Sequence, residues 1–314
     1  MIRKMKIAGA LLGAFAVTEA GITTYFYRRT MMRSRLKTER TMKMSGTDWS
    51  QYIPKMQERK AFLFAQPRED IWQQSEDGLR LHASWIPNDG AKKVVICFHG
   101  YTSRGMTDYV GLSDYYLKNG FAMLLVDERA HGESEGKYVG FGCRDRFDAL
   151  VWIDWVIETC GPEVQILLHG ISMGASTVLM TGALGLPLQV KGLVSDCAFT
   201  SPKYVFTHVL HSMYHLPAFP LIQISDRVNR RKAGYGLDEC NAAREASKIK
   251  VPLLLIHGSS DIFVPCSMCE EIYRNCPQGT KKLIVDGAGH AESYFKDPET
   301  YERTLTEFIG GIII

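Results

Sequence analysis

The sequence predicts an α/β protein: a doubly wound, mostly parallel sheet with an antiparallel hairpin at its N-terminal edge and a helical cap insertion. Three observations predict this fold class. From residue 94 onward, continuous apolar runs of strand length alternate with helix-like stretches, which is typical of parallel strands buried on both faces. Two strand-like segments, the second of which alternates between apolar and polar residues, precede these runs and indicate a half-exposed β-hairpin. One long segment, about 200–248, interrupts the alternation and predicts the cap.

Composition narrows the class of protein. The chain has 314 residues, 46% of them hydrophobic and 23% charged, which suffices for one large domain with a sizeable core. The net charge of +3 is small, so we expect no nucleic-acid partner. The eight cysteines are scattered and indicate reduced thiols rather than a disulfide framework. Cys266 and Cys269 form the only close pair and lack a second pair at zinc spacing, so we expect no metal site.

Residues 1–27 are interpreted as an N-terminal membrane-anchor segment. Three basic side chains precede the mostly apolar run from Ile7 to Tyr27, whose length fits the hydrocarbon core of a bilayer. Glu19 opposes this interpretation, because a carboxylate in lipid is costly. A signal peptide cleaved near Ala20, and hence export, is one alternative, and a helix lying on the membrane surface is another.

Residues 28–66 are basic and are interpreted as a juxtamembrane segment, with a solvated charged helix as the alternative. They carry more basic side chains than the residues before the apolar run. By the positive-inside rule, this asymmetry predicts a protein anchored by a single span, with its catalytic domain, residues 67–314, in the cytoplasm. The free cysteines favour the same compartment.

The globular elements follow in order. The hairpin is expected over Ile71–Gln74 and Leu79–Ile86, on either side of a Gly-containing turn. Buried strands are expected at Val94–Phe98, Phe121–Val126, Val164–Leu168, Gly192–Val194, Leu253–Ile256 and Leu283–Val285. Helices are expected at Asp108–Lys118, Arg144–Glu158, Ala175–Leu184 and Pro298–Ile309. The cap segment is rich in proline and aromatic residues, and we expect it to cover the carboxyl edge of the sheet, where ligands bind in open α/β sheets.

Three histidines of the cap, His208, His211 and His215, are spaced so that they share one face of a helix. No acidic or cysteine partner stands at ligand spacing, so we expect this face to line or cover the pocket rather than to bind metal.

The segment Gly170–Gly174 reads G-x-S-x-G and stands between a strand-like and a helix-like run. Such a turn holds its serine at the mouth of a helix, and its glycines avoid clashes in a crowded backbone. A serine hydroxyl needs a base and an acid to become a nucleophile. Asp261 and His290 each follow a buried strand, in the expected order after the serine. We therefore predict Ser172 as nucleophile, His290 as base and Asp261 as acid.

The acid has one rival, Asp196, directly after the Gly192–Val194 strand, where we expect a role in positioning the start of the cap. The oxyanion hole is expected to use the backbone N–H groups of Met173 and Tyr101. His99 is expected to anchor the loop that carries Tyr101.

Five segments, in this order, resemble the α/β-hydrolase superfamily: His99–Tyr101, Asp127–Ser134, Gly170–Gly174, His257–Asp261 and Gly289–His290. The second is similar to the D-x-R-G-H-G-x-S segment of the serine-aminopeptidase and monoacylglycerol-lipase-like branch, with Ala130 in place of a glycine. Together with the apolar N-terminus, the chain resembles bacterial membrane-anchored hydrolases. The resemblance implies the α/β-hydrolase fold and acyl transfer to water in two steps without a cofactor.

The function predicted is that of a serine hydrolase acting on carboxylic esters or thioesters. A serine peptidase of the aminopeptidase type, with Glu292 as a weak candidate to bind a peptide amine, is the first alternative. A non-catalytic, membrane-tethered binding protein is the second. The expected partners are a small acyl ester or short peptide and, through the N-terminal segment, a membrane.

Overall fold

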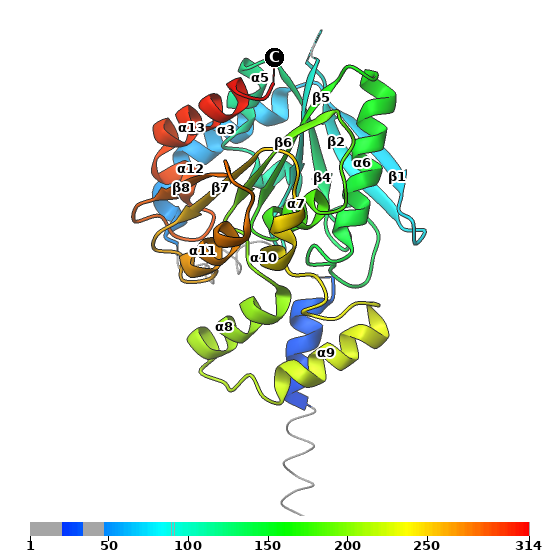
Figure 1. Cartoon of the computed structure of the whole chain (residues 1–314), viewed down its shortest axis with the longest axis vertical. Helices are drawn as coiled ribbons and strands as arrows, with labels where there is room; N and C mark the ends of the chain where they lie inside the picture. The colour runs from blue at the N-terminus through cyan, green and yellow to red at the C-terminus, as the bar shows by residue number, and fades with distance from the viewer. Residues whose placement is uncertain (1–20, 34–46, 89, 91, 314) are drawn as a thin grey trace, which may run out of the picture.

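The computed structural model describes residues 21–33, 47–88, 90 and 92–313. Its centre is an eight-stranded sheet (Figure 1). The strands are β1 Glu69–Gln74, β2 Arg80–Ile86, β3 Lys93–Phe98, β4 Phe121–Asp127, β5 Gln165–Ile171, β6 Val190–Asp196, β7 Leu253–Gly258 and β8 Lys281–Val285. The helices are η1 Trp49–Tyr52, α3 Ile53–Ala65, α4 Gly105–Asp108, α5 Ser113–Lys118, α6 Asp145–Cys160, α7 Met173–Gly182, α8 Pro202–Tyr214, α9 Leu221–Lys232, α10 Ala242–Glu245, η2 Ala246–Lys248, α11 Cys266–Asn275, α12 Ser293–Lys296 and α13 Pro298–Gly310.

The sheet has the order β1-β2-β4-β3-β5-β6-β7-β8. Strands β3 to β8 are parallel to one another, while β2 pairs antiparallel with β4 and β1 antiparallel with β2. The predicted fold class is therefore confirmed, including the antiparallel N-terminal edge. The central strands read as continuous apolar runs because helices cover both faces and leave no side of these strands in water.

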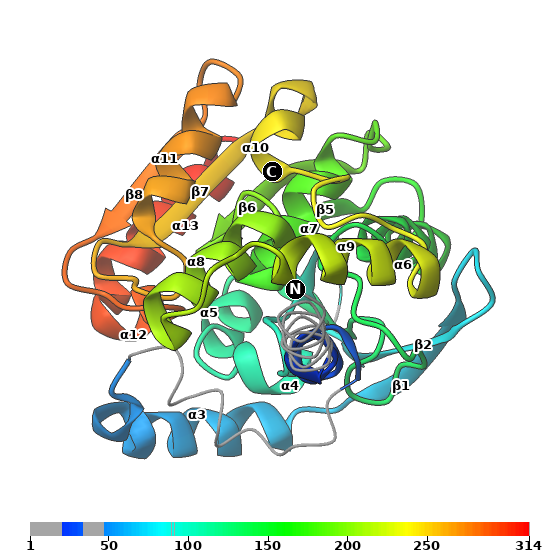
Figure 2. The same ribbon diagram turned by 90° about the horizontal axis from the view of Figure 1, so that it is seen from below.

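Each face of the sheet has its own apolar cluster. Trp152 of α6, Val178 of α7 and Ile272 of α11 belong to one cluster. Tyr116 of α5 and Phe308 of α13 belong to the other. The view along the molecule's long axis shows the helices on the two sides of the strands (Figure 2).

One expected helix is divided. The sequence pattern predicts a continuous helix over Asp108–Lys118, whereas the structure has α4 and α5 with a turn between them. Gly111 lies in that turn, and a Cβ at this position would stand 2.8 Å from the ring of Tyr294. Because the backbone at Gly111 passes so close to this ring, the chain turns here instead of continuing as one helix.

Helices α8, α9 and α10 come between β6 and β7, in the segment expected to form the cap. In Figure 1, α8 and α9 lie beyond one end of the sheet and stand apart from its two faces. A proline stands at the start of α8, where its missing N–H costs no hydrogen bond, and the Ser201 side chain accepts a hydrogen bond from the Tyr204 N–H.

The N-terminal prediction needs correction. Residues 1–20, most of the expected span, lie outside the described residues. In the described part of the chain, no helix combines the length and apolar character that crossing a bilayer requires. The predicted transmembrane segment and the localisation by a single N-terminal span are therefore wrong on this finding, and it gives no support to the membrane as partner.

The physical reason lies in what the end of the apolar run contacts. Residues 21–31 form a helix, in which Tyr27 and Met31 are buried in the same apolar cluster as the sheet and the cap. The Tyr27 hydroxyl donates to Asn229 Oδ1 of α9 at 3.3 Å. An apolar run has the same sequence pattern whether it faces lipid or another surface of the protein, and within its described residues Tyr27 packs against the protein.

The expected juxtamembrane segment is also part of the folded domain where it is described. Helix α3 packs against α5, and its Leu63 is fully buried in the second apolar cluster. Figure 2 shows α3 running along the side of the molecule. Within 28–66, helix α3 therefore packs onto the folded domain.

Candidate active site

The turn between β5 and α7 holds Ser172 in a strained conformation. Its backbone has φ 56° and ψ −110°, a combination that costs a non-glycine residue energy and that recurs at functional sites. A Cβ at Gly170 would lie 2.1 Å from the Gly174 carbonyl oxygen, and one at Gly174 would lie 2.1 Å from the Phe98 carbonyl oxygen. The two flanking glycines are therefore required by the close approach of β3, the turn and α7.

The structure brings Ser172, His290 and Asp261 into one hydrogen-bonded series. Ser172 Oγ lies 2.8 Å from His290 Nε2, and His290 Nδ1 lies 2.7 Å from Asp261 Oδ2. His290 and Asp261 come from the loops after β8 and β7, and all three side chains are buried. With the ring proton on Nδ1, the imidazole can accept the serine proton at Nε2 while it donates to the carboxylate.

Asp261 is held as a carboxylate. Its Oδ1 accepts hydrogen bonds from the backbone N–H groups of Phe263 and Val264, at 2.9 and 2.8 Å. Burial alone would raise the pKa of Asp261, but the charge of His290 and hydrogen bonds from His257 and His290 outweigh it and hold this pKa well below its usual range. The acid is thus ionised at neutral pH.

His257 is a site residue to which sequence reasoning gave no role. It ends β7, four residues before Asp261, and its Nε2 lies 2.8 Å from the Val264 carbonyl oxygen and 3.4 Å from Asp261 Oδ2. The imidazole fixes the turn that presents the carboxylate to His290. The H-G-x-x-D spacing could have indicated this role, since it puts His257 in the strand that leads into the turn carrying Asp261.

The rival acid Asp196 takes a different position. Its backbone carbonyl accepts from the Ser172 N–H at 2.8 Å, and its Oδ2 accepts from the Tyr301 hydroxyl at 3.0 Å. Burial raises the pKa of Asp196 to about 6, although the Tyr301 hydrogen bond opposes the shift. His290 directs its Nδ1 to Asp261 and not to Asp196.

The loop after β3 carries the expected oxyanion donor Tyr101. The N–H groups on both sides of it are engaged: Gly100 donates to Asp108 Oδ2 at 2.7 Å and Thr102 donates to His131 Nε2 at 3.1 Å. The N–H groups that flank Met173 are engaged likewise, since those of Ser172 and Gly174 donate to backbone carbonyls. Tyr101 and Met173 both line the cavity that contains Ser172. Their N–H groups are the remaining candidates for an oxyanion hole.

His131 fastens this loop in one protonation state. Its Nδ1 lies 3.0 Å from the Arg129 carbonyl oxygen, so Nδ1 carries the proton and Nε2 accepts from Thr102. Burial and the neighbouring His99 lower the pKa of His131 to about 3, which keeps the ring neutral. Thr102 has φ 60°, so the bond holds a non-glycine residue in the left-handed region. Sequence reasoning missed this role.

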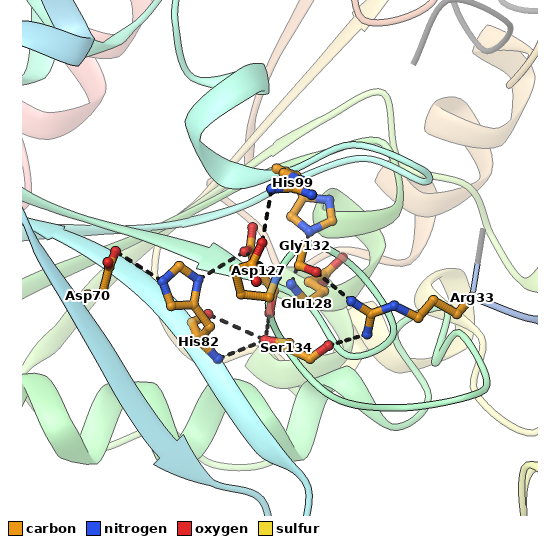
Figure 3. Close-up of polar contacts among 10 residues, drawn as sticks. Arg33, Asp70, His82, His99, Asp127, Glu128, Gly132 and Ser134 are labelled. Carbon is orange, nitrogen blue, oxygen red and sulfur yellow. Dashed lines mark hydrogen bonds and ion pairs between the residues drawn. The ribbon is translucent and has the colours of Figure 1, made fainter. Parts of the chain in front are cut away.

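The segment after β4 joins the sheet edge to this region (Figure 3). His82 of β2 has Nδ1 2.9 Å from Asp127 Oδ2 and Nε2 3.2 Å from Asp70 Oδ1. Ser134 Oγ accepts from the backbone N–H of His82 at 2.8 Å, so this second grouping of serine, histidine and aspartate does not form a relay. His99 Nε2 accepts from the Glu128 N–H at 3.0 Å and connects the β3 and β4 loops.

A cavity of about 280 Å³ opens onto the series. Ser172 and His290 line it from the sheet side, and α8 and α9 contribute apolar side chains from the cap side. Residues of the N-terminal helix, including Phe26 and Met31, line it as well, which the sequence did not indicate. The volume lies just below the range of roughly 300–1,000 Å³ that ligand pockets occupy.

Among the described residues, one group of side chains lies close enough together to hold a metal ion: Cys197, Asp261 and His290, whose ligand atoms all lie within 4.8 Å of one another. Burial raises the pKa of the Cys197 thiol well above its ordinary value, so the thiolate that binds metal is disfavoured. The carboxylate and imidazole are already bonded to each other. Cys266 and Cys269, and the three cap histidines, take part in no such group there.

The sequence is similar to one protein-family model and to several known bacterial proteins. A family model described as serine aminopeptidase, S33, matches residues 89–233. The uncharacterized protein YqkD of Bacillus subtilis (strain 168) is 30% identical over 229 residues, which cover 72% of this chain and 73% of YqkD. The uncharacterized protein YfhR of Escherichia coli (strain K12) is 23% identical over 243 residues, covering 75% of this chain and 78% of YfhR.

The structure also aligns with solved structures of esterases. An esterase of Pyrococcus furiosus aligns with a TM-score of 0.67 and 25% identity, over 81% of this chain and 94% of the esterase. An acetyl xylan esterase from Paenibacillus sp. R4 aligns with a TM-score of 0.59 and 17% identity, over 85% of this chain and 96% of that enzyme. At that lower identity the likeness concerns the fold alone.

Proposed function

The chain belongs to the α/β-hydrolase family whose model is described as serine aminopeptidase, S33, and from this premise we propose that it is a serine esterase or thioesterase. Ser172 attacks the carbonyl carbon while His290 takes its proton. Asp261 keeps the imidazole in the required tautomer and stabilises its charged form. The N–H groups of Tyr101 and Met173 stabilise the oxyanion. His290 then protonates the leaving group and activates the water that releases the acyl group.

One observation carries this proposal: Ser172 Oγ, the His290 ring and the Asp261 carboxylate form a continuous series at 2.8 and 2.7 Å beside an apolar cavity. The strained backbone at Ser172 supports it, because such conformations recur at functional sites. The likeness to a Pyrococcus furiosus esterase favours an ester as the substrate class.

The engagement of nearby carboxylates argues against an aminopeptidase, which needs an anionic group to bind the α-amino group of its substrate. Glu292, the candidate named from the sequence, accepts from the Tyr52 hydroxyl and the Gly289 N–H, each at 2.6 Å. Asp108 is the one carboxylate among the described cavity-lining residues, and it accepts from the Gly100 N–H and the Ser103 hydroxyl. Both are committed to the protein's own groups.

A substrate panel tests the proposal. Purified full-length protein and the variant Ser172→Ala are assayed with p-nitrophenyl esters, acyl thioesters and aminoacyl-naphthylamides. We expect turnover of esters or thioesters, lost by at least about 10³-fold in Ser172→Ala. Turnover confined to the naphthylamides would support the peptidase instead. Equal ester turnover by the variant and the wild-type protein would contradict the proposal.

A further inference from the structure

The N-terminal helix, residues 21–31, forms one wall of the cavity beside Ser172. Phe26 and Met31 of this helix line the cavity together with Val209 and Leu210 of α8 and Leu221 and Ile222 of α9. We call the part of the cavity bounded by these six side chains the apolar chamber. Figure 1 shows the same helix between α8 and α9. We propose that the apolar chamber binds a long aliphatic acyl chain and that the N-terminal helix determines the chain length accepted.

The helix is fastened to the site at both of its faces. The Phe26 ring packs edge-on against Tyr214 of α8 with centroids 5.0 Å apart, and Tyr27 bonds Asn229 of α9. The Tyr101 hydroxyl donates to the Arg29 carbonyl oxygen at 2.9 Å. The same residue, Tyr101, carries the proposed oxyanion N–H. The helix is thus held in place by α8, by α9 and by the loop after β3.

The chain continues from this helix into a second attachment. The Val139 N–H donates to the Met31 carbonyl oxygen and the Arg33 N–H to the Lys137 carbonyl oxygen, each at 2.9 Å, and Met32 forms an antiparallel bridge with Tyr138. These bonds fix the end of the helix to the segment before α6. The wall is thus anchored by backbone as well as by side chains, as a specificity element requires.

The chemistry of the chamber selects hydrocarbon. Its six defining side chains carry no hydroxyl, amide or charged group, and the Thr30 hydroxyl beside them donates to the Phe26 carbonyl oxygen at 2.8 Å within its own helix. The same three helices also contribute Arg29, Tyr214 and Ser225 to the cavity lining. A peptide or sugar placed against the six apolar side chains would lose hydrogen bonds to water without replacing them. An aliphatic chain loses none, and each buried methylene group strengthens binding by up to about fourfold.

The inference rests on the proposed esterase function for its substrate, and chain-length kinetics test it. The full-length protein is assayed with p-nitrophenyl acetate and p-nitrophenyl dodecanoate. Thr30→Phe adds a ring to the helix wall, and Thr24→Phe places the same ring on the same helix at an exposed residue outside the cavity lining. Val209→Phe narrows the chamber from the α8 side and keeps the test valid if Thr30→Phe fails to fold.

We expect the wild-type kcat/KM to be higher for dodecanoate than for acetate. Thr30→Phe and Val209→Phe should lower it for dodecanoate by about tenfold or more, with the value for acetate within about twofold. Thr24→Phe should match the wild type on both esters. Equal effects of the chamber variants on both esters, or a wild-type preference for acetate, would overturn the inference while leaving the esterase proposal intact.

A binding measurement separates the two proposals. Dansyl-undecanoate fluorescence reports occupancy of the chamber without turnover. If the wild-type protein hydrolyses no ester but binds this probe, and Thr30→Phe weakens the binding about tenfold while Thr24→Phe does not, the chamber stands and the esterase proposal falls. If the probe binds all variants equally, the chamber proposal is contradicted whatever the kinetics show.

Discussion

At the scale of single residues, two carboxylates near the carboxyl ends of neighbouring strands, Asp196 in β6 and Asp261 in the loop after β7, have opposite environments. Asp261 accepts two backbone N–H groups and the imidazole of His290, and its pKa is lowered. Asp196 accepts from one tyrosine hydroxyl, and burial raises its pKa to about 6. A carboxylate that must stabilise an imidazolium has to stay ionised, so the environment of Asp261 suits the acid and that of Asp196 does not.

Replacing each carboxylate by its amide tests this assignment. Asp261→Asn should lower kcat by roughly 10⁴-fold, because the amide no longer fixes the tautomer of His290. Asp196→Asn should keep kcat within about tenfold, since Asp196 contacts the site through its backbone carbonyl, which the substitution retains. Steady-state ester kinetics on both variants provide the measurement. The reverse ranking would assign the acid to Asp196.

The sequence could predict that Ser172, Asp261 and His290 lie close together because each stands in a glycine-containing loop directly after a recognisable strand. It did not assign supporting roles to His257, His131 or Asp108, although the H-G-x-x-D spacing offered a signal for His257. Their partners are mostly backbone groups of loops, at Val264, Thr102 and Gly100. Loop conformation is set by tertiary contacts and not by a periodic pattern, so such bonds become visible only in the structure.

At the scale of elements, the loop after β3 depends on the loop after β4. Thr102 sits in the left-handed region and is held by the neutral ring of His131, and His99 ties Gly100 to Glu128. Two loops that are adjacent in the sheet order thereby share one network. The orientation of the Tyr101 N–H follows from bonds made by its neighbours.

His131→Ala tests this coupling. The Thr102 N–H loses its partner, so the loop can relax from its left-handed conformation, and we expect kcat to fall by about tenfold or more with a smaller change in KM. Glu133→Ala, at an exposed residue of the same loop, is the matched control and should leave both constants within about twofold. A rise in KM alone would show that His131 shapes the binding pocket instead.

The sequence predicted well those strands and helices whose pattern of apolar residues shows which side chains are buried. The six parallel strands lie where continuous apolar runs stand, and α6 and α13 follow their expected ranges within two residues. The N-terminal helix is the instructive failure. Tyr27, which is buried, is the last residue of an apolar run that a bilayer or a cap could equally cover. Contacts such as those with Asn229 and Tyr214 distinguish the two and are visible only in the structure.

At the scale of the whole molecule, groups distant in sequence converge on one end of the sheet. Ser172 and His290 are 118 residues apart, and the N-terminal helix and the cap meet above them. The sheet supplies a rigid edge for the chemistry, and the helices outside it supply an apolar space. The strand patterns of the sequence indicate which residues are buried in the sheet, so the fold could be predicted from them. The apolar chamber depends on contacts between helices that are distant in the sequence, so it could not be predicted.

Reaction with a fluorophosphonate followed by peptide mass mapping shows whether Ser172 is an activated nucleophile. Wild-type protein should gain one phosphonyl group, on Ser172, and Ser172→Ala and His290→Ala, checked for folding by circular dichroism, should stay unlabelled on the same timescale. Folded wild-type protein that remains unlabelled, or that is labelled at another serine such as Ser134, would show that Ser172 is not the activated nucleophile.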